Sequence, residues 1–195
     1  MTNFFSDISQ PELIDNLNSD GVGVLPTDTV YGLVARAHSQ SAIAKLYGIK
    51  SRERKPGTTI AASVEQLIEL GFPASELEIA SRYWPNAVSV ELSSANIPDY
   101  LKAGQSVMAA RIPNHPALRT LLERTGPLMT TSANAHKQPT STTVEMAHQY
   151  FGNEVDFYVD GGDLSNRAPS TIIGISPDGT ITMYREGAVR IEPSA

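Results

Sequence analysis

The sequence has 195 residues, 41% of them hydrophobic, and this length suits one compact domain with a sizeable core. It contains no cysteine, which excludes disulfide frameworks, thiolate nucleophiles and cysteine zinc sites. The formal net charge of -6 argues against a protein that coats nucleic acid through bulk charge. No stretch approaches the roughly 20 apolar residues of a membrane span, and the first residues lack a basic, apolar leader, so we expect a cytoplasmic protein.

Short apolar segments alternate with helix-start signals along the chain, which is typical of an α/β domain. We predict strands over Val22 to Leu25, Thr58 to Ala62, Val88 to Leu92, Val107 to Ala110, Leu128 to Thr131, Val155 to Val159, Thr171 to Ile175 and Thr180 to Tyr184. A hydroxyl residue followed three positions later by Glu or Gln predicts helix starts at Ser9, Ser63, Ser75 and Thr142.

The last two predicted strands flank the pair Asp178-Gly179, which is typical of a tight reversal. We therefore expect a C-terminal antiparallel hairpin and a mixed sheet. Long loops are expected over Ala135 to Thr143 and Gly161 to Pro169, and a frayed tail over Glu192 to Ala195. We interpret residues 1–195 as a single domain.

Polar side chains follow the first predicted strand directly, in the segment Pro26 to Leu33. It offers two hydroxyls, a carboxylate and a phenol, and strand ends are where α/β sheets usually bind ligands. The alternative is that Pro26 ends the strand and the threonines only stabilise a turn. Residue chemistry alone favours the turn.

Five of the 15 basic residues gather within eleven positions: Lys45, Lys50, Arg52, Arg54 and Lys55. They lie at the end of a helix predicted to run from about Ser41, where one or two cations would stabilise the helix terminus. The remainder indicate a site for phosphates, for which Lys supplies a point charge and Arg a bidentate fork. A Walker-type phosphate loop is absent from the sequence.

Three further segments place polar groups at strand ends. Arg111 ends a predicted strand and either clamps a carboxylate or forms a surface salt bridge, while Pro116 marks a helix start closed by Asn114 or His115. Thr130 to Asn134 can hold a ribose, a phosphate or a small polar substrate, or can form turns without a ligand. Ser170 stands at the entrance to another strand.

Taken in order, these segments resemble the YrdC-type threonylcarbamoyl-AMP synthase family. The shared motifs are Pro26 to Leu33, Lys50-Ser51-Arg52, Arg111 to Pro116, Ser132-Ala133-Asn134 and Pro169 to Ile172, within a match from about Gly21 to Val189. The resemblance implies a twisted mixed sheet with surrounding helices around a deep, electropositive cavity.

The resemblance also implies a nucleotidyltransferase that joins L-threonine, bicarbonate or CO2, and ATP into threonylcarbamoyl-AMP, with release of pyrophosphate. A partner transferase then uses this product to make threonylcarbamoyladenosine (t6A) in tRNA, and direct tRNA contact stays open. Mg²⁺ is expected to bridge the ATP phosphates without protein side-chain ligands.

By the same resemblance, Lys50 and Arg52 are the catalytic, phosphate-holding pair. The other implied ATP contacts are Ser132, Asn134, Thr140 and Arg185. The implied threonine contacts are Thr27, Arg111, Thr130 and Ser170, with Arg111 on the carboxylate.

The chain departs from the family pattern after Arg52, where Glu53 and then Lys55-Pro56-Gly57 stand, and after Asn134, where Ala135-His136-Lys137 stands. These altered loops leave a second hypothesis open, a non-catalytic nucleotide- or RNA-binding module on the same fold. It predicts RNA affinity that falls steeply with salt and no product. A carbamoyl-transfer enzyme with another acceptor is a third hypothesis, but we expect such relatives to carry additional domains.

Overall fold

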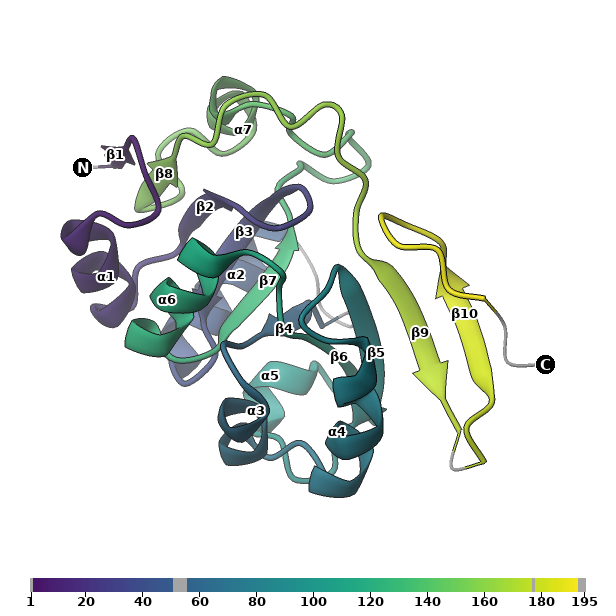
Figure 1. Cartoon of the computed structure of the whole chain (residues 1–195). Coiled ribbons are helices and arrows are strands. Elements are labelled where there is room, and N and C mark those ends of the chain that lie inside the picture. The colour runs from purple at the N-terminus through teal and green to yellow at the C-terminus, as the bar shows by residue number, and fades with distance from the viewer. Residues whose placement is uncertain (1, 51–55, 177, 193–195) are drawn as a thin grey trace.

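The computed structural model describes residues 2–50, 56–176 and 178–192. Within these ranges ten strands form one mixed sheet in the order β1-β8-β2-β3-β7-β4-β6-β5-β9-β10 (Figure 1). The strands are β1 Asn3–Phe5, β2 Gly23–Pro26, β3 Tyr31–Arg36, β4 Thr58–Ile60, β5 Val88–Ser93, β6 Val107–Arg111, β7 Leu128–Ser132, β8 Phe157–Val159, β9 Thr171–Ile175 and β10 Ile181–Arg185.

Seven α-helices and one 3-10 turn complete the described part of the chain. They are α1 Pro11–Asn18, α2 Gln40–Lys50, α3 Val64–Leu70, α4 Ala74–Ala80, the 3-10 turn η1 Ser81–Tyr83, α5 Asp99–Lys102, α6 Pro116–Thr125 and α7 Val144–Phe151. Among the described residues, none of these helices combines the length and the apolar character needed to cross a bilayer.

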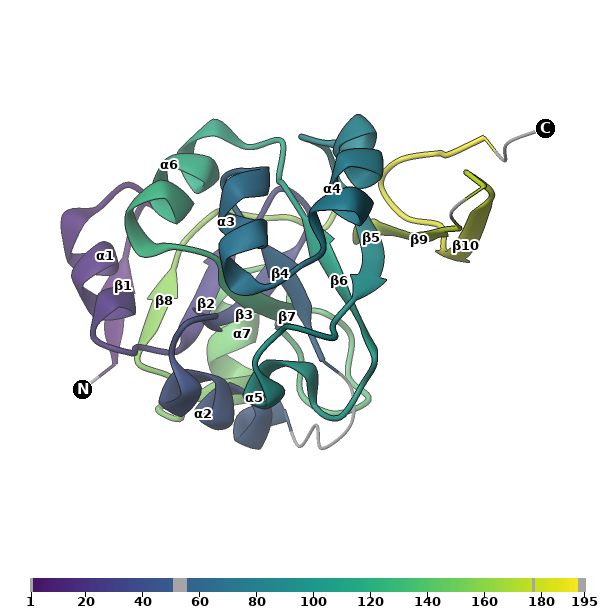
Figure 2. The same cartoon turned by 90° about the horizontal axis from the view of Figure 1, so that it is seen from below.

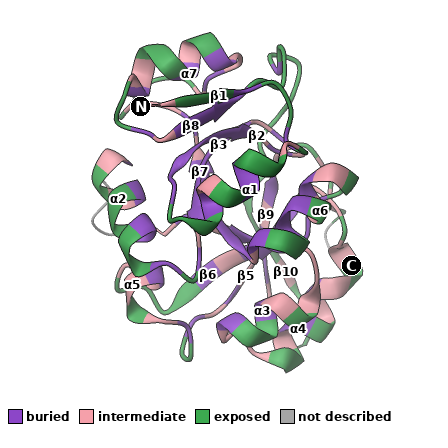
Figure 3. Ribbon diagram, turned by 90° about the vertical axis from the view of Figure 1, so that its left-hand side faces the viewer, coloured by how far each residue is buried: buried purple, intermediate pink, exposed green. Residues whose placement is uncertain are grey.

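The sheet carries helices on both faces. Figure 2 shows α1, α6, α3 and α4 on one side, with α2 and α5 on the other. Alternation along β3 fits this arrangement, because Leu33 and Ala35 join the core under α2 while Val34 joins the core under α1 and α6. The central strands and the inner faces of the helices are accordingly buried, whereas the edge strands β1 and β10 are largely exposed (Figure 3). A single α/β domain with a mixed sheet is confirmed.

All eight predicted strands are present, and two further strands were not predicted. β1 is a short edge strand that pairs with β8, and β3 begins inside the segment Pro26 to Leu33, for which residue chemistry alone favoured a turn, and continues to Arg36. β2 and β3 form an antiparallel hairpin in which Pro26 faces Tyr31. The polar motif is therefore a tight turn between two central strands, and this position fixes its side chains.

The predicted helix starts were partly wrong. Ser63 caps α3 by accepting a hydrogen bond from the Gln66 amide, as expected. Thr143 rather than Thr142 caps α7, and α4 begins before Ser75, after Pro73. The Ser9 prediction fails because α1 begins at Pro11 and the Gln10 side chain accepts from Ser6 and Asp7 instead.

Two other predictions near chain turns are confirmed. His115 closes the start of α6, where its Nδ1 accepts from the Leu118 amide and Pro116 takes the first helical position. β9 and β10 form the expected antiparallel hairpin, which ends the sheet opposite β1 (Figure 1). Of the predicted frayed tail, 193–195 lie outside the described residues.

Candidate active site

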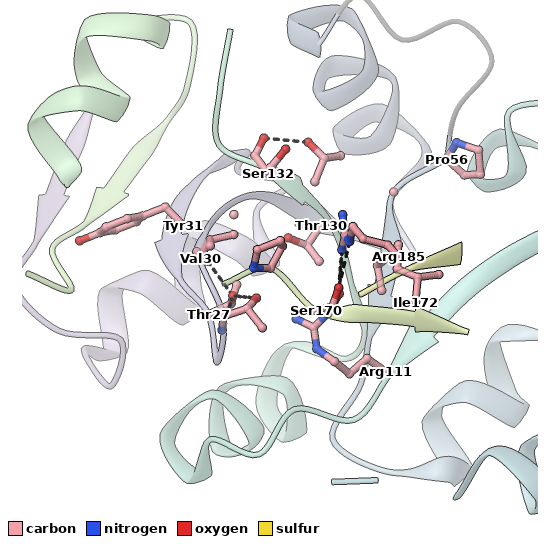
Figure 4. Close-up of a pocket in the computed structure, with 16 residues that line it drawn as sticks. Thr27, Val30, Tyr31, Pro56, Arg111, Thr130, Ser132, Ser170, Ile172 and Arg185 are labelled. Atoms are coloured by element: carbon pink, nitrogen blue, oxygen red, sulfur yellow. Dashed lines mark hydrogen bonds between the residues drawn. The ribbon is translucent and has the colours of Figure 1, made fainter. Parts of the chain in front are cut away.

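A pocket of about 180 Å³ opens where several strands end (Figure 4). It is lined by Thr27, Thr29, Val30, Tyr31, Gly32, Pro56, Gly57, Thr58, Arg111, Thr130, Thr131, Ser132, Pro169, Ser170, Ile172 and Arg185. Hydroxyl groups and two guanidinium groups dominate the lining. Such a surface suits a small polar ligand that carries negative charge.

The β2–β3 turn holds its own shape through Thr27. The Thr27 hydroxyl donates to the Val30 carbonyl at 2.7 Å and accepts from the Thr29 amide at 3.1 Å. The two readings of this motif are therefore compatible, since Thr27 stabilises the turn and also lines the pocket.

Tyr31 ties this turn to the loop before β9. Its hydroxyl donates to the Gly162 carbonyl at 2.9 Å and accepts from the Gly161 amide at 2.7 Å. Burial raises the pKa of the Tyr31 phenol, so the group remains a neutral donor. Arg167 adds a hydrogen bond to the Thr27 carbonyl at 3.1 Å. The loop is thus fastened beside the pocket at two points.

Arg111, the last residue of β6, forms a buried ion pair and not the surface salt bridge considered from the sequence. Its Nη2 donates to Asp28 Oδ1 at 2.8 Å, and both side chains are 3% exposed. Its Nη1 donates to the Ser89 hydroxyl at 3.1 Å. The guanidinium is therefore held between the β2–β3 turn and β5, at the wall of the pocket.

Ser170 connects the two pocket arginines. Its hydroxyl accepts from Ser89 at 2.9 Å and from Arg185 Nη2 at 3.1 Å, and its carbonyl accepts from Arg185 Nε and Nη2. Burial, with the neighbouring charge of Arg111 as a smaller cause, lowers the pKa of Arg185. Arg185 stays charged nonetheless, because an arginine pKa lies far above neutral pH.

Lys50, at the end of α2, contacts the loop after β7. Its ammonium donates to the Ser132 carbonyl at 2.9 Å, the Asn134 carbonyl at 2.6 Å and Asn134 Oδ1 at 2.8 Å. Ser132 also donates to Asn134 Oδ1, at 2.7 Å. Lys50 of the Lys-x-Arg motif and the Ser-x-Asn motif, far apart in the sequence, therefore meet in space.

The fold brings together most of the expected site residues. Thr27, Arg111, Thr130, Ser132, Ser170 and Arg185 line the pocket. Lys50 and Asn134 lie beside it, joined through Ser132, and Thr140 is on the loop beyond them. Arg52 falls outside the described residues.

Two residues of the pocket network carried no assigned role in the sequence reading. Asp28 belongs to the first polar motif and pairs with Arg111, and Ser89 bridges Arg111 to Ser170. The signal for Asp28 was its place within that motif. The signal for Ser89 was a polar residue between Val88 and Val90 in a predicted apolar strand, and the structure buries it fully.

An α/β domain with a hydroxyl- and guanidinium-lined pocket at its strand ends belongs to the class of small-ligand-binding α/β proteins. Comparison with known proteins narrows the class. The family model described as "Telomere recombination", for Sua5, YciO and YrdC proteins, matches residues 15–187. The chain belongs to this Sua5/YciO/YrdC family.

Relatives and solved structures agree with that membership. Threonylcarbamoyl-AMP synthase of Marinobacter nauticus is 34% identical over 161 residues, which cover 80% of this chain and 85% of that protein. A variant of P. abyssi Sua5 superposes with a TM-score of 0.83 at 26% identity, and P. abyssi Sua5 complexed with L-threonine with 0.80 at 25%. Both alignments cover 96% of this chain and 57% of the other.

Proposed function

We propose that this protein is a threonylcarbamoyl-AMP synthase, a nucleotidyltransferase that uses L-threonine, bicarbonate or CO2, and ATP. The threonine ammonium loses a proton to become an amine, which attacks CO2; a second proton leaves the nitrogen for solvent as the carbamate forms. A carbamate oxygen then attacks the α-phosphorus of ATP, the bond from that phosphorus to the bridging oxygen of the β-phosphate breaks, and pyrophosphate leaves. The sequence of steps needs no protein nucleophile.

The observation that carries this proposal is the pocket itself, in a chain that is 34% identical to a threonylcarbamoyl-AMP synthase. Its volume of about 180 Å³ suits a small amino acid and leaves the bulk of a nucleotide outside. Arg111 at its wall supplies a planar donor for a carboxylate. The binding of L-threonine by P. abyssi Sua5 supports the same ligand here.

In this proposal the threonine lies among Thr27, Arg111, Thr130 and Ser170. Arg111 receives the carboxylate, and the hydroxyls of Thr130 and Ser170 face the polar groups of the amino acid. The Thr27 hydroxyl already donates to the Val30 carbonyl and accepts from the Thr29 amide within its own turn. Thr27 therefore shapes the pocket wall more than it hydrogen-bonds to the threonine ligand. Val30 and Ile172 give an apolar surface for a methyl group.

ATP is proposed to lie on the side of Lys50, with Ser132, Asn134, Thr140 and Arg185 as further contacts. Lys50 and Arg52 are the proposed phosphate-holding pair. Because three acceptors already surround the Lys50 ammonium, a phosphate oxygen must replace one of them. Two guanidiniums at the pocket, one offset by Asp28, support an electropositive cavity. Catalysis then comes from positioning and charge neutralisation.

Mg²⁺ is proposed to enter with the nucleotide. The described residues hold no cluster of three His, Asp or Glu side chains that could form a dedicated cation site, and Asp28 uses one oxygen on Arg111. Phosphate oxygens and water are the ligands that Mg²⁺ accepts in such settings. When bound, the ion would neutralise developing charge on the phosphates.

The product would pass to a transferase that modifies the adenosine beside the anticodon in tRNAs reading codons that begin with A. We propose this role in the cytoplasm and keep direct tRNA contact as a hypothesis. The acidic net charge of -6 restricts any such contact to a local patch.

Pyrophosphate release from ATP and Mg²⁺ tests the proposal. Threonine and bicarbonate are added singly and then together, with serine in place of threonine as the control. Release that needs both additions and prefers threonine is expected. ATP binding without release, together with salt-sensitive RNA affinity, would favour the non-catalytic binding module instead.

A further inference from the structure

A buried carboxylate stands behind the pocket arginine. Asp28 lies in the β2–β3 turn, and Arg111 ends β6, with β7 and β4 between β3 and β6 in the sheet. The ion pair thus joins the β2–β3 turn to the end of β6, and it spans the two intervening strands β7 and β4. Neither side chain is more than 3% exposed.

This ion pair is incomplete. One contact, Nη2 to Oδ1, joins the two groups, while Asp28 Oδ2 and Arg111 Nε have no hydrogen-bond partner among the described residues. A buried ion pair stabilises a fold only when its remaining donors and acceptors are satisfied, and a two-pronged fork would satisfy both of these atoms. A merely structural role does not account for the unused donor on a pocket-lining arginine.

The charges around the pocket explain what Asp28 adds. Arg111 and Arg185 converge on Ser170. Arg185 binds Ser170 directly (Figure 4), and Arg111 reaches it through the Ser89 hydroxyl. Arg111 is buried and Arg185 is exposed, and the two like charges repel each other, since the charge of Arg111 contributes to lowering the pKa of Arg185. Asp28 offsets one charge and fixes the orientation of Arg111 before a ligand arrives.

We propose that Asp28 is a positioning residue that holds Arg111 ready to bind the carboxylate of an amino-acid substrate. The proposal rests on the proposed function of the pocket and adds a residue to it. Asp28 touches Arg111 and not the reacting atoms. Loss of the Asp28 carboxylate therefore lowers the affinity for the amino acid, because it changes the orientation of the Arg111 guanidinium and leaves its charge without a partner.

Calorimetric titration of L-threonine into wild type and Asp28→Asn tests this inference. The amide keeps the size and one acceptor but removes the charge. We expect the dissociation constant for threonine to rise at least about tenfold, with the number of sites per chain unchanged. A purely structural role would instead lower the number of sites and leave the affinity of the folded molecules unchanged.

L-threoninamide, which lacks the carboxylate, provides the matched ligand. It should bind weakly to wild type, and Asp28→Asn should weaken it no further, because the contact that Asp28 prepares is missing. Asp7→Asn, a turn carboxylate that accepts from the Ser9 amide, is the control variant and should bind threonine as wild type does. Should Asp28→Asn fail to fold, Asp28→Glu takes its place, because it keeps the charge but displaces it. We expect Asp28→Glu to weaken the binding of threonine and not that of threoninamide.

The outcomes separate the two proposals. Tight threonine binding by wild type with equal binding by Asp28→Asn, or by Asp28→Glu where it is the variant that folds, would overturn the role of Asp28 alone. Equal weakening of threonine and threoninamide would do the same. Absence of threonine binding by wild type and Asp7→Asn would overturn the proposed function, and the positioning role with it.

Discussion

The Lys50 ammonium lies 2.8 Å from Asn134 Oδ1 and 2.6 Å from the Asn134 carbonyl oxygen, so α2 is bound directly to the loop after β7. Lys50 comes from the Lys-x-Arg motif and Asn134 from the Ser-x-Asn motif, 84 residues apart. The proposed ATP side of the site depends on this junction.

Lys50→Met should weaken the use of ATP. The methionine fills a similar volume but removes the donor to the Asn134 carbonyl, which costs roughly 1–3 kcal/mol of stability. Asn134 Oδ1 keeps the Ser132 hydroxyl, and the Ser132 carbonyl keeps the Asn134 amide. We expect the KM for ATP to rise at least about tenfold and the KM for threonine to change less than about threefold. Steady-state pyrophosphate release and urea unfolding measure the two effects.

Lys45→Met is the matched control for that variant. Lys45 pairs with Asp156 at the surface, where both side chains are about two-fifths exposed (40% and 39%), so its loss should cost no more than about 1 kcal/mol. An equal rise of both KM values in Lys50→Met would contradict a specific role on the ATP side.

Arg111→Ala should impair threonine use and destabilise the fold. It removes the proposed carboxylate donor and leaves Asp28 buried without its counter-charge, a change that typically costs about 3–5 kcal/mol. Kinetics at a temperature where the variant is folded should show a larger rise in the KM for threonine than for ATP. A variant as stable as wild type would show that the ion pair contributes little to folding.

Gly32→Ala should narrow the threonine subsite. A methyl group on Gly32 would lie 2.5 Å from Thr130 Oγ1 and 3.2 Å from Thr27 Cγ2, so one of these pocket side chains must move. We expect threonine affinity to fall about tenfold or more, as measured by calorimetry. Gly48→Ala in α2, where a methyl group meets nothing within 4 Å, is the control and should gain about 0.5–1 kcal/mol in stability. Unchanged threonine affinity in Gly32→Ala would place the subsite elsewhere.

Tyr158 predicts a loss of stability at alkaline pH. Burial, followed by the charge of Glu154, raises the pKa of its phenol to about 12, while an unfolded tyrosine titrates near pH 10. The protonated Tyr158 phenol therefore contributes fully to the free energy of unfolding below about pH 10. This contribution is lost as the pH rises toward about 12, because the unfolded chain releases the proton first.

Tyr158→Phe tests this alkaline loss. It should flatten the pH dependence of the urea midpoint above about pH 10, and it should also lose the hydrogen bond to the Gly152 carbonyl. Tyr184→Phe, whose side chain is exposed, should retain the wild-type slope. An identical alkaline slope in Tyr158→Phe and wild type would assign the effect to other groups.

Local patterns in the sequence predicted most of the sheet. Apolar runs bounded by turn signals, such as Thr171 to Ile175, became strands with the expected bounds. β3 was not predicted because Tyr31 and Gly32 belong to a motif rich in polar residues. Its strand conformation comes from pairing with β2 and β7. Tertiary pairing decided where local chemistry was ambiguous.

Local sequence patterns were also of limited use in predicting where helices begin. The spacing of Ser63 and Gln66 was sufficient because both side chains are free to bond the nearby backbone, with Gln66 Oε1 accepting from the Ala62 amide. Two adjacent threonines precede α7, and the spacing rule selected Thr142 because Glu145 lies three positions later, whereas Met146 stands three positions after Thr143. The structure uses Thr143, whose hydroxyl accepts from the Met146 amide.

The site was predictable in its parts but not in its contacts. The resemblance named Arg111, Ser170 and Arg185, and the structure brings all three together. The partner of Arg111 was not predictable, since Asp28 lies 83 residues away and any of the 21 acidic residues could have paired with it. Long-range side-chain pairing requires the fold.

The most direct test of the proposed activity is the identity of the product. Wild type is incubated with ATP, Mg²⁺, threonine and ¹³C-bicarbonate. The nucleotide products are then separated, and their masses are measured by mass spectrometry. The account predicts an adenylate that contains threonine and the labelled carbon, formed together with pyrophosphate. Binding of ATP and threonine without any labelled adenylate would contradict it.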